Sequence, residues 1–223
     1  MCCNRVTLGT VTRLPTYGKG VCKVTTAAVQ TGDDMKPQRD RILDIVVELL
    51  ETEGYDAVQL REVARRARTS LATIYKRYGT RDELILAALE CWMAENRYAG
   101  LAAQTHRADE SLYDGMMRVL RTIFEPWERH PAMLKAYFRA RSAPGGQRLL
   151  RRGLDAVVPA AMEVQAGVDT SLVQDHDNIL SSLVYGLLGR FAADEIEITE
   201  ILPTLDRAVH RLTSAYDSAA SES

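Results

Sequence analysis

The sequence has few of the residues that build metal centres, disulfide frameworks or membrane spans. Only four of its 223 residues are cysteine, three of them at Cys2, Cys3 and Cys22, and no Cys-x-x-Cys pair or spaced Cys/His set predicts zinc. No apolar run reaches the roughly 18 residues that a membrane helix needs. Because no apolar core of the secretory kind opens the chain either, we expect a cytoplasmic protein with no metal, no cofactor and no membrane partner.

Signatures of catalysis are missing as well. No Ser-His-Asp set, paired cleft carboxylates or phosphate-cradling glycine loop occurs at a convincing spacing, and Gly18-Lys19-Gly20 lacks the rest of a P-loop. We therefore predict no catalytic residues and no enzyme. The net charge of −2 also argues against an architectural protein that binds DNA without sequence preference, since such proteins are usually strongly basic.

What the chain does have is helical periodicity in a globular composition, with 46% hydrophobic and 26% charged residues. The first helix has Ile42, Ile45, Val46, Leu49 and Leu50 on one face. We predict an all-α fold with helices over about 37–52, 71–78, 80–103, 111–129 (interrupted at Pro126), 131–142, 146–166, 171–193 and 200–217.

The segment Val58–Leu84 predicts two short helices joined by a tight turn. Val63, Ala64 and Ala67 give the first a small apolar face, and Ser70 is placed to cap the second, over Leu71–Tyr78. At 100° per residue, the second helix has a packing side and a free side. The packing side comprises Leu71, Ile74 and Tyr78; the free side comprises Thr69, Ala72, Thr73 and Lys76.

Charge and chemistry on this segment suit DNA. From Ala57 to Arg81 seven basic residues face a single acid, Glu62, a local balance of +6 in a chain of net charge −2. Ala72 can approach a thymine methyl, Thr73 can bond a base edge or a phosphate, and Lys76 offers a charge. A helix-turn-helix that enters the major groove is therefore indicated, although a three-helix packing motif with a solvated basic side has the same periodicity.

Residues Arg39 to Leu84 resemble the DNA-binding domain of TetR-family transcriptional regulators. The matching pieces are Glu53-Gly54-Tyr55, Val63-Ala64, Ser70, Thr73-Ile74-Tyr75, Tyr78, and Arg81 with Leu84. The resemblance implies DNA contacts by Ser70, Ala72, Thr73, Tyr75 and Lys76, and phosphate contacts at helix starts by Arg61, Thr80 and Arg81. Thr69 lies on the same free side, and we expect it to contact DNA as well. Arg68, Leu71, Gly79 and Arg81 depart from the family pattern, and the first two leave the operator sequence open.

The rest of the chain offers a dimer interface and an effector pocket. The last two helices have broad apolar stripes, and in the family such a pair forms a four-helix bundle with its symmetry mate, although a purely internal core is the alternative. We expect the dimer interface at Ile179, Leu183, Leu187, Leu205, Val209 and Leu212. Bulky apolar residues of the middle helices predict a ligand pocket, although most of them could simply be core. These are Trp92, Met116, Phe124, Trp127, Met133, Tyr137, Phe138 and Met162.

Together these features predict a flexible tail over 1–35, a helix-turn-helix domain over 36–80, and a helical effector-binding and dimerisation domain over 81–218. The expected function is that of a ligand-responsive repressor. Its dimer would bind a palindromic operator in double-stranded DNA and leave when a small apolar or amphipathic effector binds. A ligand-independent regulator and an activator are the alternatives.

Overall fold

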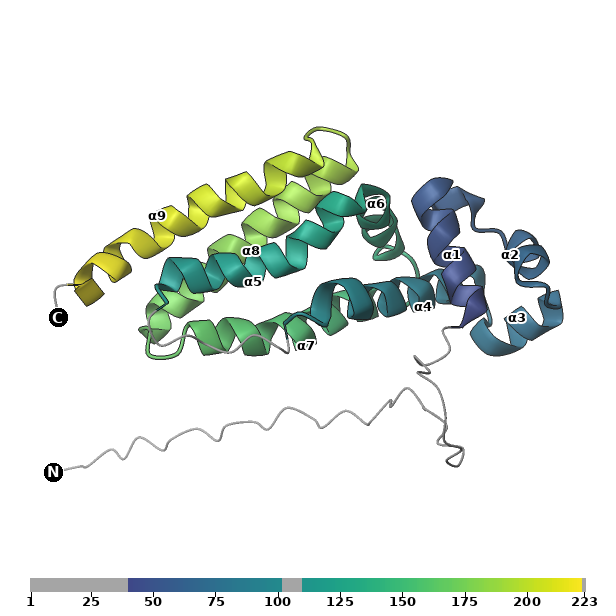
Figure 1. Ribbon diagram of the computed structural model, residues 1–223, viewed down its shortest axis with the longest axis horizontal. Coiled ribbons are helices and arrows are strands. Elements are labelled where there is room, and N and C mark those ends of the chain that lie inside the picture. The colour runs from purple at the N-terminus through teal and green to yellow at the C-terminus, as the bar shows by residue number, and fades with distance from the viewer. Residues whose placement is uncertain (1–39, 102–109, 222–223) are drawn as a thin grey trace, which may run out of the picture. The chain divides into compact units, whose positions relative to one another are not determined.

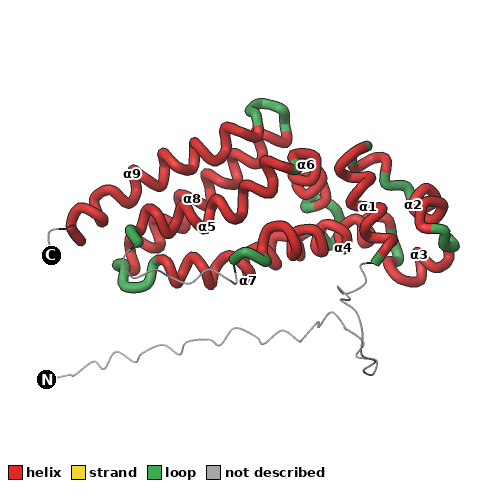
Figure 2. The backbone as a smooth tube through the Cα atoms, in the orientation of Figure 1, coloured by secondary structure: helices red, strands yellow, loops and turns green. Residues whose placement is uncertain are grey.

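The computed structural model describes residues 40–101 and 110–221, and helices are the only regular elements within these ranges (Figure 2). The prediction of an all-α fold is confirmed. The predicted tail, residues 1–35, lies outside the described residues. Within the described ranges, no helix combines the length and the apolar character needed to cross a membrane.

Three helices form a unit that we call the head, residues 40–80 (Figure 1). They are α1 (Arg41–Thr52), α2 (Leu60–Ala67) and α3 (Leu71–Tyr78), with a short 3₁₀ turn, η1 (Tyr55–Ala57), between the first two. Asp40 caps α1 by accepting a hydrogen bond from the Ile42 amide at 3.1 Å. All five apolar residues predicted for the inner face of α1 are buried, which confirms that face.

The turn between α2 and α3 has the tight geometry that the sequence predicts. Arg68 adopts the left-handed conformation, with φ of 52°, where a residue with a Cβ is disfavoured relative to glycine. Its amide and that of Thr69 donate to the last carbonyls of α2, at Arg65 and Ala64. Because these bonds end α2 in the manner of a C-cap, the chain turns at once into α3.

Helix α4 (Arg81–Met93) leaves the head and enters a larger helical bundle (Figure 1). It packs against α1 and α3 of the head, and against α6 and α7 of the bundle. It is therefore buried on several faces rather than along one stripe. A π-helical turn, η2 (Ala94–Tyr98), follows it, and such a turn widens the helix by one residue.

The bundle comprises α5 (Leu112–Arg129), α6 (Pro131–Ala140), α7 (Gln147–Val164), α8 (Thr170–Ala192), η3 (Ile198–Glu200) and α9 (Ile201–Ser221). Figure 1 shows α5 in its middle, and α5 contacts α6, α7 and α9. The predicted interruption at Pro126 is wrong, because α5 continues through this residue. Pro126 removes one backbone donor, and the burial of Phe124 and Trp127 beside it holds the helix together.

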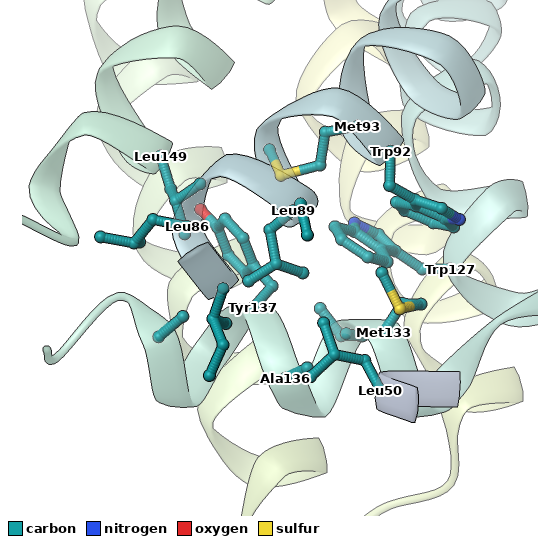
Figure 3. Packing of buried hydrophobic residues seen from close by; sticks show 14 of the residues in the cluster. Leu50, Leu86, Leu89, Trp92, Met93, Trp127, Met133, Ala136, Tyr137 and Leu149 are labelled. Atoms are coloured by element: carbon teal, nitrogen blue, oxygen red, sulfur yellow. The ribbon is translucent and has the colours of Figure 1, made fainter. Parts of the chain in front are cut away.

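Most residues predicted to line an effector pocket instead fill the core. The rings of Trp92 and Trp127 stack with their centroids 4.9 Å apart, and the Tyr137 ring lies 5.6 Å from that of Trp127. Figure 3 shows these side chains interleaved with Leu89, Met93 and Met133. Phe124 is buried too, and Met116 and Phe138 are partly buried against the core. Met162 lies on the outer surface of α7 with 68% of its area exposed.

The predicted dimer stripe divides into two sets. Leu187, Leu205 and Val209 are between 0% and 5% exposed within the single chain, so the prediction that they face a partner is corrected. The cause is that α9 packs its apolar face onto α5 and α8 of the same chain. Ile179 is 48% exposed, and Leu183 and Leu212 are partly exposed, so these three remain candidates for contact with a partner.

Candidate nucleic-acid interface

Helix α3 packs against the head with one side and exposes the other. The Ser70 hydroxyl accepts a hydrogen bond from the Thr73 amide at 3.0 Å and lies 2.8 Å from the Thr73 hydroxyl, which fixes the first turn. Ile74 is 1% exposed and anchors the inner side. Ala72 and Lys76 lie on the outer side and are exposed, as are Thr73, Tyr75 and Ser70, while Thr69 is partly buried. The two sides match the sequence prediction.

The basic residues of the head fall into two groups, paired and unpaired. Arg65 and Arg66 both bind Glu62 at 2.6 Å, and Arg66 also binds Glu53 at 2.7 Å. Hydrogen bonds from the two guanidinium groups lower the pKa of Glu62 to about 2, so this carboxylate stays charged. The positive charges of these two arginines are therefore balanced by carboxylates of the head itself.

Three cations of α2, α3 and the turn between them are not paired with a carboxylate in this way. Within the part of the chain that the structure describes, no carboxylate pairs with Arg61, Arg68 or Lys76, and all three are exposed. Such side chains can neutralise phosphates without first breaking an internal ion pair. Arg68 was not among the predicted DNA-contacting residues. Its position in the α2–α3 turn, beside the predicted set, was the signal that could have added it.

Asp40 connects the two ends of the head. Its carboxylate caps α1 and accepts hydrogen bonds from the guanidinium of Arg77 and the hydroxyl of Tyr78. Burial, followed by the hydrogen bond to Asp40, raises the pKa of Tyr78 above its usual range. Because Arg77 and Tyr78 form the last turn of α3, this cluster fixes the direction in which α3 points.

Arg81, for which a phosphate contact is predicted, makes hydrogen bonds within the chain. Its Nε donates to the Val58 carbonyl and its Nη2 to the Tyr55 carbonyl, both at 2.6 Å, and its guanidinium lies 4.8 Å from the centre of the Tyr55 ring. These bonds tie the start of α4 to the segment before α2. Thr80 caps α4 by accepting from the Glu83 amide at 3.1 Å, and it remains exposed.

The bundle contacts the head through α6 and through His130, the residue before α6. Arg139 forms two hydrogen bonds of 2.7 Å with Asp56, and its guanidinium lies 4.5 Å from the Tyr55 ring centre. His130 Nδ1 lies 2.7 Å from a carboxylate oxygen of Glu51 on α1. We call these two contacts the α6 clamp. They connect the bundle directly to α1 and η1 of the head.

A cavity of about 270 Å³ opens between α4 and α7. Its apolar lining includes Met93, Ala94 and Leu149, and none of the eight predicted pocket residues lines it. Glu90 at its edge binds Arg148 at 2.8 Å and Arg152 at 3.8 Å. The remaining lining residues are Tyr98, Arg152, Asp155 and Ala156. The periodicity of the sequence could not predict this cavity, because the cavity depends on the distance between α4 and α7.

Comparison with known families agrees with this geometry. Residues 42–88 match the profile described as "Bacterial regulatory proteins, tetR family". Residues 110–212 match the profile described as "Tetracyclin repressor-like, C-terminal domain". The two profiles cover the head with the start of α4, and nearly all of the bundle.

Individual relatives are similar along between about half and four fifths of the chain. The HTH-type transcriptional repressor KstR of Mycobacterium tuberculosis is 28% identical over 198 residues, which cover 82% of this chain and 84% of the relative. The uncharacterized HTH-type regulator YvkB of Bacillus subtilis is 30% identical over 105 residues, 47% of this chain and 53% of the relative.

Solved structures share the fold. A TetR transcriptional regulator from Rhodococcus sp. RHA1 superposes with a TM-score of 0.56 at 21% identity, covering 77% of this chain and 93% of that chain. A second, TetR-like regulator from Rhodococcus sp. RHA1 gives a TM-score of 0.54 at 18% identity, covering 77% and 92%. The head, the bundle and both family profiles agree, and the chain belongs to the TetR family of DNA-binding transcriptional regulators rather than to any class of enzyme.

Proposed function

We propose that this regulator is a homodimeric repressor that binds a palindromic operator and is released from it by an apolar or amphipathic small molecule. One observation carries the DNA-binding part. Helix α3 exposes Ala72, Thr73 and Lys76, while Ile74 on its other side is 1% exposed. A short helix with small, polar and basic side chains outward is what a major groove accepts. The direct contacts would be made by Ser70, Ala72, Thr73, Tyr75 and Lys76, with Arg61, Arg68 and Thr80 near phosphates.

Exposed apolar residues on α8 support a homodimer. Ile179 is 48% exposed and Tyr185 is 57% exposed on the same helix. Gly186 lies nearby, and a Cβ added to it would meet nothing within 4 Å, so a partner helix could approach closely there. Two heads related by a two-fold axis would then meet half-sites roughly 34–36 Å apart, in successive turns of the major groove.

The α6 clamp supports control by a ligand. Arg139 and His130 belong to the bundle, whereas Asp56 and Glu51 belong to the head. A ligand that shifts α6 or α4 would therefore change the position of α3. Full release requires that the ligand favour the non-binding arrangement by about 5.5 kcal/mol, the difference that reverses a 1:99 population.

Repression rather than activation is favoured by the relatives. KstR proteins from Mycobacterium tuberculosis and Mycolicibacterium smegmatis, both named transcriptional repressors, align along 82% and 79% of this chain. Repression requires only that the dimer occupy a promoter. A DNA-binding head and a dimer interface are sufficient for that. The regulator would act in the cytoplasm, where its operator lies.

The decisive experiment begins with selection of bound sequences from random duplex DNA. Fluorescence anisotropy then compares the selected palindrome, one isolated half-site and an unrelated duplex. The palindrome should bind far more tightly than either control. Lys76→Ala should weaken binding, whereas Lys135→Ala should not, because Lys135 is exposed on the bundle and pairs with Asp194.

Each alternative has its own outcome. Tight binding of monomer to an isolated half-site would contradict the dimer, and equal affinity for unrelated duplex would indicate an architectural protein. A reporter gene whose transcription rises when the operator is occupied would identify an activator. Operator affinity that no bound small molecule changes would identify a ligand-independent regulator.

A further inference from the structure

Arg97 is a buried cation in the interior of the bundle. It lies in the π-helical turn η2 and only 7% of its surface is exposed. Its Nε donates to the Ile123 carbonyl at 2.9 Å and its Nη1 lies 3.3 Å from the Tyr98 hydroxyl. Its guanidinium lies over the Trp127 ring, 4.3 Å from the centre. Among the residues that the structure describes, no carboxylate pairs with it.

This arrangement is costly in the free protein. Buried charges in proteins are normally paired, because removal from water costs several kcal/mol per ion. Burial lowers the pKa of Arg97 only to about 10, so the side chain remains charged at neutral pH. Two of the five guanidinium N–H donors have the partners described above, which leaves three for another acceptor. An anion would supply both the missing charge and the missing acceptors.

One residue, Tyr98, connects this cation with the α4–α7 cavity. Tyr98 lines the cavity, and its hydroxyl is the same group that contacts Arg97. On the facing helix, α7, a Cβ added to Gly153 would stand 3.1 Å from the Tyr98 hydroxyl, so glycine there gives this ring its space. Tyr98 therefore contacts both the apolar cavity and the buried cation.

We propose that Arg97 binds the carboxylate of an amphipathic effector whose apolar part occupies the cavity between α4 and α7. The inference rests on the proposed function, since it names the chemical class of the ligand that releases the operator. A carboxylate suits a guanidinium because two parallel N–H···O bonds can form. The apolar lining suits a short hydrocarbon chain, since the cavity of about 270 Å³ is at the small end of ligand sites.

Ring contacts lead from Arg97 to the head. Arg97 lies over Trp127, which stacks on Trp92, and the His130 ring lies edge-on to Trp92 with centroids 5.4 Å apart. His130 in turn contacts Glu51 of α1. A carboxylate that draws Arg97 away from Trp127 would disturb this stack at one end and the α6 clamp at the other. The chemistry of the site and its control of the head are thus connected.

The test uses the full chain and matched probes. Decanoate, 1-decanol and methyl decanoate share one hydrocarbon chain and differ in charge. The only two tryptophans, Trp92 and Trp127, both belong to the stack, so intrinsic fluorescence reports binding. Decanoate should bind the wild type at least about tenfold more tightly than the neutral analogues, as expected for charge-assisted hydrogen bonds. Arg97→Met should remove that preference, and Arg97→Lys should restore part of it.

Controls separate a binding role from a structural one. Arg151→Met removes an exposed cation of α7 that does not line the cavity, and it should leave decanoate affinity unchanged. Without ligand, Arg97→Met should melt at the wild-type temperature or above it, because it removes a buried charge that no carboxylate of the described residues pairs with. A lower melting temperature would assign Arg97 to folding alone and overturn the proposal.

Other outcomes are equally clear. Equal affinities for decanoate and decanol, or no binding of decanoate, would overturn the carboxylate assignment. Operator affinity without ligand is measured in parallel by anisotropy, so failure of the regulator to bind DNA would be seen separately. A neutral analogue that releases operator in place of decanoate would uphold the proposed function and contradict this inference.

Discussion

The head and the bundle are stabilised by different forces. The bundle buries large side chains such as Trp127 and Met133, with stacked rings at its centre. The buried apolar residues of the head continue the same cluster, and the head adds polar contacts at its joints, where Asp40 holds the end of α3 and Arg81 holds the start of α4. A charge placed in an apolar core costs several kcal/mol, whereas polar joints can be loosened without loss of the core. The difference suits a well-packed bundle joined to a head that can be repositioned.

Unpaired cations show the same contrast. Lys76 and Arg68 have no carboxylate partner among the described residues, and both are in water, where a free charge costs little. Arg97 also lacks such a partner, but it is buried. An exposed free cation suits a phosphate backbone that is recognised by charge. A buried one suits a single small anion that must displace protein contacts to reach it.

The largest expected effect tests the contribution of apolar burial to the stability of the bundle. Leu205→Asp places a carboxylate at a position that is 0% exposed within the single chain. The loss of packing and the buried charge should together destabilise folding by more than about 4 kcal/mol. Circular dichroism and chemical denaturation measure this.

Ile179→Asp is the matched control, because Ile179 is 48% exposed on α8. It should leave the monomer folded and shift sedimentation from dimer to monomer. If Leu205→Asp instead gave a folded monomer, Leu205 would belong to the interface between subunits, and the assignment of α9 to the internal core would be wrong.

The next largest effect tests how much the polar contacts at the joints of the head contribute to stability. Arg81→Ala removes two hydrogen bonds from a guanidinium to the carbonyls of Tyr55 and Val58, and should destabilise folding by about 2 kcal/mol. Lys76→Ala should leave stability unchanged and reduce the slope of log affinity against log salt by about one. Urea denaturation and salt-dependent anisotropy distinguish the two residues. A normal stability of Arg81→Ala with a reduced salt slope would restore its predicted phosphate contact.

Much of the head could be predicted from the sequence, because short-range periodicity decides it. The α1 face from Ile42 to Leu50 and the range of α3 match the prediction. The role of Arg81 could not be predicted, because its carbonyl partners lie 23 and 26 residues away. In the bundle, an apolar stripe fits an internal core and a dimer interface equally well. Only the packing of α9 on α5 and α8 decided the roles of Leu205 and Val209.

A smaller effect concerns sequence preference rather than stability. Thr73→Val keeps the shape of the side chain and removes the hydroxyl that contacts Ser70. If Thr73 bonds a base edge, discrimination among operator variants should change by about 1–3 kcal/mol. Competition among selected operators in anisotropy measures this. Unchanged discrimination with slightly weaker capping would restrict the Thr73 hydroxyl to the helix start.

The smallest effect is at the joint between the two regions. A hydrogen bond from Arg139 lowers the pKa of Asp56 below its usual value. A carboxylate with a depressed pKa in the folded state contributes stability above its unfolded pKa of about 3.9, and this is lost as the pH falls. The difference in unfolding free energy between wild type and Asp56→Asn should therefore be constant from neutral pH to about 5 and shrink below that. A difference that grew on acidification would mean a raised pKa, and Arg139 would then not hold the head through this carboxylate.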